Sequence, residues 1–171
     1  MKRLAIDMDG VMADVYSQFI KMHAEEFGEQ LILADLEGKT ESEAFPGLLK
    51  HVNSKGFFRN APLIEGCQEY IKLLNEKYKV FIVSAAMEFP GSLLEKQLWL
   101  NEHFPFITWQ QMVFCGSKEI INCDIMIDDH FKNLDYFSGE TILFTQPHNK
   151  LADTKNHKRV NNWEEVNLLL M

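Results

Sequence analysis

The chain has 171 residues, of which 46% are hydrophobic and 25% are charged, and its formal net charge is −8. This length and balance suit one globular domain, and the absence of a low-complexity tract or internal repeat argues against disorder beyond the ends. The acidic balance also argues against a nucleic-acid polymer as partner, because binding to a phosphate backbone needs a basic stripe.

The first expected element is a short buried strand over residues 3–6, which ends in the tetrapeptide DMDG with Asp7 and Asp9. No stretch approaches the ~18 apolar residues of a membrane span, and the first apolar run is too short for a signal peptide. We therefore expect a cytoplasmic protein without membrane contact. Two carboxylates at the end of a buried strand repel each other and lose hydration, so we expect a cation or a reaction there. A calcium-binding EF-hand loop is excluded, because its first and last ligand positions would fall on Ala5 and Tyr16.

Residues 16–60 do not fit an alternation of strands and helices. Their apolar residues recur at helical spacing in two stripes, formed by Phe19, Met22, His23 and Phe27, and by Leu48, Leu49 and Val52. A structureless loop of this length is improbable in a compact domain. We therefore expect a helical cap over residues 16–60, inserted into a core domain of residues 1–15 and 61–171. The apolar stretch from Phe45 to Leu49 suits either the core of this cap or the contact of a homodimer, and both remain open.

The remaining chain alternates helices and strands. A helix beginning at Cys67 is indicated by apolar residues at i, i+3, i+4 and i+7, and the capping-box spacing of Ser92 and Glu95 predicts the start of another, ended by Pro105. Further strands are expected at 79–84, 111–117, 123–129 and 140–145, with a closing helix at 162–170. This pattern predicts an α/β fold with a Rossmann-like parallel sheet of about five strands, flanked by helices.

Polar residues collect where these strands end. Parallel sheets bind ligands at the carboxyl ends of their strands. Carboxylates hold Mg²⁺, while a lysine and a hydroxyl neutralise and orient phosphate oxygens, so this set favours phosphoryl transfer. The residues concerned are Asp7, Asp9, Ser84, Lys118, Asp128 and Asp129.

The motifs DMDGV, VSAA, a lysine ahead of the fourth strand and IDDH resemble, in that order, the four motifs of the haloacid dehalogenase (HAD) superfamily of Mg²⁺-dependent phosphatases. The segments DMDGVMAD, GFFRNAPLIEG, ILFTQPHN and NNWEEV are similar to the 5′(3′)-deoxyribonucleotidase family. The resemblance covers nearly the whole chain. It implies hydrolysis of the phosphate monoester of a (deoxy)ribonucleoside monophosphate through an aspartyl-phosphate intermediate, with Mg²⁺ as cofactor and a small helical cap after the first strand.

The resemblance also implies roles for individual residues. Asp7 would be the nucleophile, and Asp9 would protonate the leaving oxygen and then activate water. Mg²⁺ would be held by Asp7, by the backbone carbonyl of Asp9 and by Asp128, with Asp129 binding a metal water or orienting Lys118.

The phosphate would be bound by Ser84 and Lys118, helped by backbone N–H groups that include that of Ala85. Phe57 and Phe58 are the expected contacts of the nucleobase, because aromatic rings stack on bases with little preference for one base over another. The family often has Thr, Ser and Pro where this chain has Ser84, Ala85 and Ala86, so one side-chain donor is lost.

The sequence leaves three alternative functions open. A phosphatase of this type could act on a different small phosphomonoester, and the cap would decide the substrate. A non-catalytic phospho-receiver also gathers acids, a hydroxyl and a lysine at a sheet edge, but its lysine comes last, whereas Lys118 precedes Asp128 and Asp129. A silent binding module on the same scaffold would not need all of these acids.

Overall fold

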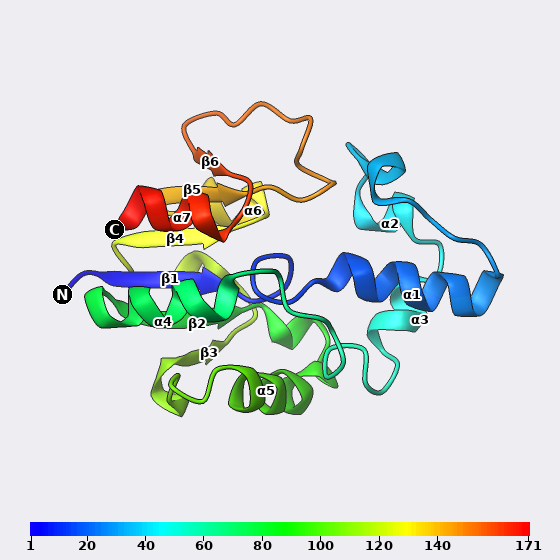
Figure 1. Cartoon of the computed structure of the whole chain (residues 1–171), viewed down its shortest axis with the longest axis horizontal. Coiled ribbons are helices and arrows are strands. Elements are labelled where there is room, and N and C mark those ends of the chain that lie inside the picture. The colour runs from blue at the N-terminus through cyan, green and yellow to red at the C-terminus, as the bar shows by residue number, and fades with distance from the viewer.

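The computed structural model describes all residues, 1–171, and is centred on a parallel sheet with the strand order β3-β2-β1-β4-β5-β6 (Figure 1). The expected α/β fold is confirmed, but the sheet has six strands rather than about five. The additional strand, β6, has only three residues, of which two are basic, so it has no apolar run to mark it. The strands are β1 Arg3–Asp7, β2 Lys79–Ser84, β3 Met112–Phe114, β4 Ile125–Asp128, β5 Glu140–Phe144 and β6 Lys158–Val160.

Helices cover both faces of the sheet (Figure 1), and all connections between consecutive strands except that from β5 to β6 contain helical turns. Side chains of β1 alternate between two cores: Leu4 and Ile6 join the larger one with residues of α4, α5 and α7, and Ala5 joins a smaller one with α6. None of the helices combines the length and hydropathy that a membrane crossing requires. The α-helices are α1 Val15–Phe27, α2 Glu41–Ala44, α3 Leu48–Val52, α4 Cys67–Lys77, α5 Ser92–His103, α6 Phe131–Leu134 and α7 Trp163–Leu170; the 3₁₀ segments are η1 Leu33–Leu36, η2 Ala86–Glu88, η3 Trp109–Gln111 and η4 Lys118–Ile120.

Helix α5 is present where expected, but the capping box predicted for it was wrong. The hydroxyl of Ser92 donates to the carbonyl of Ala86 at 3.2 Å instead of capping its own helix. The carboxylate of Glu95 accepts hydrogen bonds from the backbone N–H groups of Gly56, at 2.6 Å, and Arg59, at 3.2 Å. Both side chains thus bond to groups outside α5 instead of capping it, and Glu95 attaches the loop around residues 56–59 to α5.

The segment after β1 lies beyond the carboxyl ends of the strands, where α1, α2 and α3 stand apart from the layers that flank the sheet (Figure 1). The chain leaves and re-enters the core along two adjacent paths. Ala13 and Leu63 form an isolated antiparallel bridge, and the N–H of Ile64 donates to the carbonyl of Met12 at 2.8 Å. These bonds tie the two crossings together between the helical segment and the sheet.

The apolar stripes expected in this segment are only partly buried. Phe45 is fully buried and stacks on Phe19 of α1, with ring centroids 4.7 Å apart, so it belongs to the protein's own core. Leu49 and Phe27 were expected in the same stripes but are 69% and 50% exposed. Phe27 is the last residue of α1, and Leu49 lies in the short helix α3, which has one covered face. The prediction that these two residues belong to buried stripes was therefore wrong.

Trp163 provides a test of how the last helix holds the loop after β1. Its buried indole N–H donates to the carbonyl of Val11 at 2.8 Å. Trp163→Phe leaves that carbonyl without a partner and should lower the free energy of unfolding by about 1–3 kcal/mol, measured by urea denaturation. Trp109→Phe is the control, because Trp109 is 73% exposed and should lose almost nothing. Equal losses in both variants would contradict a specific role for this hydrogen bond.

Candidate active site

The polar residues predicted at the strand ends lie around the point where the strand order reverses. β1 pairs with β2 on one side and β4 on the other, so the connections leaving β1 and β4 diverge there. Open α/β sheets bind ligands in the crevice that this divergence creates. Asp7, Ser84 and Asp128 are the last residues of β1, β2 and β4, and Lys118 begins η4 after β3.

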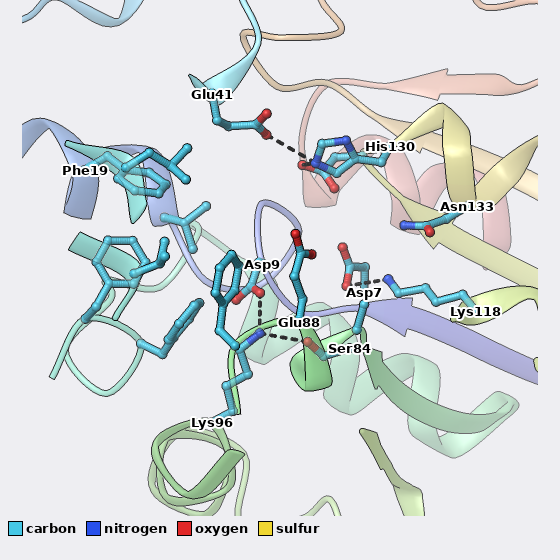
Figure 2. A pocket seen from close by; sticks show the side chains of 18 of the residues that line it. Asp7, Asp9, Phe19, Glu41, Ser84, Glu88, Lys96, Lys118, His130 and Asn133 are labelled. Atoms are coloured by element: carbon cyan, nitrogen blue, oxygen red, sulfur yellow. Dashed lines mark hydrogen bonds and ion pairs between the residues drawn. The ribbon is translucent and has the colours of Figure 1, made fainter. Parts of the chain in front are cut away.

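Lys118 joins the first and last of the predicted acidic motifs. Its Nζ lies 2.6 Å from Oδ1 of Asp7 (Figure 2). It also lies 2.6 Å from Oδ2 of Asp128, and all three side chains are buried. The carboxylate of Asp128 also accepts the side-chain amide of Asn133 at 3.0 and 3.1 Å and the N–H of His130 at 2.9 Å. The carboxylates that orient Lys118 are therefore those of Asp7 and Asp128, not that of Asp129.

Burial and mutual charge shift the protonation of this cluster. Burial raises the pKa of Asp7 well above its usual value, Lys118 opposes that rise, and the charge of Asp128 adds to it. Burial likewise raises the pKa of Asp129 to about 7, with a further contribution from Asp128. Although burial alone would lower the pKa of Lys118, the carboxylates of Asp128 and Asp7 hold it above its usual value. Full ionisation of these carboxyl groups would exceed the charge of one ammonium, and the raised pKa values reflect that imbalance.

The same carboxylates fit a bound cation. One oxygen from each of Asp7, Asp128 and Asp129 lies within 4.8 Å of the others. Oδ1 of Asp129 is buried and has no hydrogen-bond partner, an arrangement that costs free energy unless a cation or its water supplies one. An all-oxygen set of carboxylates is the donor chemistry that hard divalent cations prefer.

A second buried lysine, Lys96 of α5, completes the site and was not predicted from the sequence. Its ammonium contacts the carboxylate of Asp9 and lies 2.8 Å from Oγ of Ser84 (Figure 2). Lys96 occupies the same face of α5 as Ser92 and Trp99, and its side chain is only 3% exposed. A lysine on the buried face of an amphipathic helix was the signal that could have identified it.

The backbone around the site offers several hydrogen-bond donors. The N–H of Met8 donates to Oδ1 of Asp7 at 2.8 Å. The N–H groups of Asp9 and Ala85 donate to no acceptor within the protein. They remain available to a ligand, and Ala85 lines the same cavity as Ser84.

A cavity of about 210 Å³ opens above these groups. One wall is apolar and comes mostly from residues 15–58, with Phe57 and Phe58 among its members; the other is polar and includes Glu41, His130 and Asn133 (Figure 2). Phe57 and Phe58 are only 1% and 5% exposed, and their rings meet edge to face at 4.8 Å. They therefore combine packing in the protein interior with a position beside the cavity.

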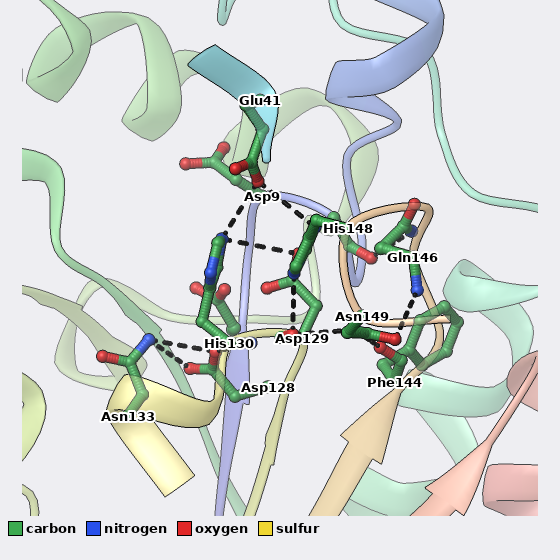
Figure 3. A network of polar contacts seen from close by, with 12 residues as sticks. Asp9, Glu41, Asp128, Asp129, His130, Asn133, Phe144, Gln146, His148 and Asn149 are labelled. Carbon is green, nitrogen blue, oxygen red and sulfur yellow. Dashed lines mark hydrogen bonds and ion pairs between the residues drawn. The ribbon is translucent and has the colours of Figure 1, made fainter. Parts of the chain in front are cut away.

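Glu41, on the polar wall, lies beside two histidines, His130 in the loop after β4 and His148 in the loop after β5 (Figure 3). Its carboxylate lies 3.2 Å from Nε2 of His130 and 3.3 Å from Nδ1 of His148. Burial alone would raise the pKa of Glu41, but the hydrogen bond and charge of His130 lower it to about 2. The pKa of His130 is raised to about 10 by Asp129 and Glu41, against the effect of burial. Paired as a cation with Glu41, His130 therefore joins the loop after β4 to the helical segment.

His148 has a different part in this network. Its Nε2 donates to the carbonyl of Asp129 at 2.9 Å, and its Nδ1 accepts from the hydroxyl of Tyr16 at 3.1 Å. Burial and the neighbouring His130 lower its pKa, in agreement with a neutral ring. The rings of His130 and His148 are stacked with centroids 4.2 Å apart and planes 12° apart, so their in-plane lone pairs do not converge on one point. Glu41 thus pairs with His130, while His148 bonds to Asp129 and Tyr16, and the three residues do not form a metal site.

Comparison with solved structures identifies the class of fold. The chain resembles a haloacid dehalogenase-like protein of unknown function from Agrobacterium tumefaciens, with a TM-score of 0.65 and 12% identity, over 99% of this chain and 97% of that one. It also resembles magnesium-bound YfnB from Bacillus subtilis, assigned to the HAD hydrolases, with a TM-score of 0.62 and 16% identity, over 99% and 98% of the two chains. These similarities show that the chain has the fold of the HAD-like proteins.

Sequence comparison then identifies the family. Residues 2–171 match the family described as 5′ nucleotidase, deoxy (pyrimidine), cytosolic type C protein. The 5′(3′)-deoxyribonucleotidase of Bacillus subtilis strain 168 is 39% identical over 173 residues, covering 99% of both chains. The protein of that name from Bacillus phage SPbeta has the same identity and coverage. This chain belongs to that nucleotidase family, which confirms the resemblance drawn from the motifs.

Gly10 tests how tightly the acidic motifs are packed. It has φ of +76°, and a Cβ at this position would lie 2.3 Å from Oδ2 of Asp129. Gly10→Ala must therefore displace that carboxylate as well as strain the backbone. Gly28→Ala is a matched control, because Gly28 has φ of +67° but a Cβ there would meet nothing within 4 Å. Chemical denaturation should show a loss at least ~1 kcal/mol larger for Gly10→Ala, and equal losses would contradict the close contact.

Proposed function

We propose that the protein is a Mg²⁺-dependent phosphatase that hydrolyses (deoxy)ribonucleoside monophosphates in the cytoplasm, as a 5′(3′)-deoxyribonucleotidase. The observation that carries this proposal is that Asp7 and Lys118 meet at the floor of a cavity with one apolar wall, where Lys118 is also bonded to Asp128. The charged floor suits a phosphate group and a cation, and the apolar wall suits the nucleoside. The names of the related proteins support the same substrate class.

Asp7 is the proposed nucleophile, and its hydrogen bonds indicate which oxygen attacks. Oδ1 accepts from the N–H of Met8 and contacts Lys118, whereas Oδ2 has no such partner. Attack by Oδ2 on phosphorus forms the aspartyl-phosphate as the bond from phosphorus to the ester oxygen breaks. Lys118 stays beside the forming bond and neutralises charge on the phosphate oxygens.

Asp9 is the proposed acid and base. It gives a proton to the departing ester oxygen and then takes a proton from the water that hydrolyses the aspartyl-phosphate. In the substrate-free chain its carboxylate is held by Lys96. Lys96 already lies beside Ser84, so its ammonium can bind phosphate oxygens from this position, together with Ser84 and the N–H of Ala85.

Asp7, Asp128 and the backbone carbonyl of Asp9 would hold Mg²⁺, with Asp129 beside them. A bound Mg²⁺ would supply positive charge that offsets both the clustered carboxylates and the phosphate. Oδ1 of Asp129 is buried and has no hydrogen-bond partner, which supports a position of Asp129 next to the cation or a metal-bound water.

The helical segment of residues 16–60 is proposed to act as a cap over a core of residues 1–15 and 61–171. It supplies most of the apolar wall, including Phe57 and Phe58, which we propose lie close to the nucleobase. The polar bridge from Glu41 to His130 supports a closed arrangement of cap and core.

Phosphate release tests the proposed function directly. The wild-type protein with Mg²⁺ should release phosphate from deoxyribonucleoside monophosphates, and Asp7→Asn should lower the rate by at least about 10³-fold because it removes the nucleophile. The panel contains 5′- and 3′-deoxyribonucleotides, ribonucleotides and sugar phosphates. Release from sugar phosphates alone would keep the mechanism but contradict the substrate class. No release from any compound would contradict the phosphatase itself.

Metal removal gives a test that needs no substrate. Because the carboxylate cluster is buried and exceeds its lysine in charge, saturating Mg²⁺ should raise the melting temperature of chelator-treated protein by about 5 °C or more. Asp128→Asn should reduce this rise, while Asp35→Asn, on an exposed residue away from the site, should keep it. An unchanged rise in Asp128→Asn would contradict the assigned ligand.

A further inference from the structure

The ammonium of Lys96 has a third contact besides Asp9 and Ser84. Its Nζ lies over the ring of Phe58, 4.4 Å from the ring centroid. The lysine side chain is 3% exposed and Phe58 is 5% exposed, so water does not screen this contact. A cation over an aromatic face is attracted by the negative centre of the ring, and the attraction is strongest where both groups are desolvated.

We propose that Phe58 is a positioning residue for catalysis: its ring holds the ammonium of Lys96 between the carboxylate of Asp9 and the hydroxyl of Ser84. This inference rests on the proposed phosphatase function. It gives Phe58 a role in the chemical step for every phosphate ester, in addition to any contact with a nucleobase.

The chemistry of the site explains why an aromatic ring suits this position. A lysine side chain is flexible, and a buried ammonium needs a favourable partner in each direction that it faces. A carboxylate in place of the ring would attract the ammonium but would also repel the incoming phosphate. The ring attracts the cation through its quadrupole without adding a net charge to the phosphate site.

The loop that carries Phe58 is fastened to α5, the helix of Lys96, by three hydrogen bonds. Glu95 accepts from the N–H groups of Gly56 at 2.6 Å and Arg59 at 3.2 Å, on either side of Phe58. The indole of Trp99 donates to the carbonyl of Ala61 at 2.8 Å. Residues 95 and 99 flank Lys96 on the same helix, so the ring and the ammonium are held to one scaffold.

The other side of Phe58 is supported by aromatic packing. Its ring meets that of Phe57 edge to face at 4.8 Å, and Phe57 in turn packs on Phe19 of α1 at 4.7 Å. Phe58 therefore has little freedom to move away from Lys96. The position of the ammonium beside Asp9 is set jointly by α5 and by the interior of the helical segment (Figure 2).

Replacement of Phe58 by 3,4,5-trifluorophenylalanine tests this role, because fluorine depletes the negative face of the ring while its shape is nearly kept. The substrates are p-nitrophenyl phosphate, which has no nucleobase, and the nucleotide that the wild-type protein hydrolyses fastest. We expect kcat/KM to fall about three- to ten-fold on both. The same replacement at Phe45, which is buried in the same region but lies outside the cavity, should leave kcat/KM unchanged.

A double-mutant cycle with natural residues gives an independent measurement. Phe58→Leu should lower kcat/KM about ten-fold in the wild-type background and have almost no further effect in Lys96→Met, which removes the ammonium but keeps the stem. Phe58→Tyr, which keeps the aromatic face, should restore most of the activity. Thermal melting of each variant separates loss of folding from loss of coupling.

The outcomes separate this inference from the proposed function. If the wild-type protein hydrolyses neither p-nitrophenyl phosphate nor any nucleotide, the phosphatase function is overturned. If it is active but the trifluorinated variant loses activity only on the nucleotide, Phe58 is a base contact and the positioning role is overturned. An undiminished effect of Phe58→Leu in the Lys96→Met background would overturn it as well.

Discussion

Asp7 and Asp128 end two adjacent buried strands, and their carboxylates share the single ammonium of Lys118 at 2.6 Å each. Two carboxylates that share one partner inside a protein repel each other and are tolerated only when nearby groups compensate their charge. The surrounding chain provides such groups. Asn133 and the N–H of His130 supply further donors to Asp128. The sheet places the acids, and the loops after β3 and β4 balance them. The excess negative charge that remains is what makes this edge of the sheet suited to a cation.

A second set of charge pairs lies around the same cavity. Lys96 reaches Asp9 and Ser84 from α5, while the stacked pair His130 and His148 lies beneath Glu41. The pair of Glu41 and His130 joins the segment after β1 to the core by charge, and Lys96 contacts that segment through the ring of Phe58. A phosphate entering the cavity therefore meets ammonium groups that are already oriented, which reduces the reorganisation needed during the reaction.

The sequence predicted the fold and the acidic motifs well because these depend on local patterns. Apolar runs followed by Asp7, Ser84 and Asp128 mark strand ends, and helical spacing marks α1, α4 and α7. Lys96 escaped prediction because its meaning depends on which groups α5 faces. The capping box at Ser92 and Glu95 failed for a related reason. Glu95 bonds to Gly56 and Arg59, which are distant in sequence, and Ser92 bonds to the preceding turn at Ala86, so the local spacing did not decide their partners.

By itself, then, the sequence determined the parallel α/β architecture, the order of the motifs and the family, because periodicity and short motifs are properties of neighbouring residues. Only the tertiary structure decided that Lys118 bridges Asp7 and Asp128, and that the ammonium of Lys96 lies over the ring of Phe58. It also decided that β6 completes the sheet. These features join segments far apart in the chain, and their energies come from burial and from charges brought together in a medium of low dielectric constant, which exists only after the chain has folded.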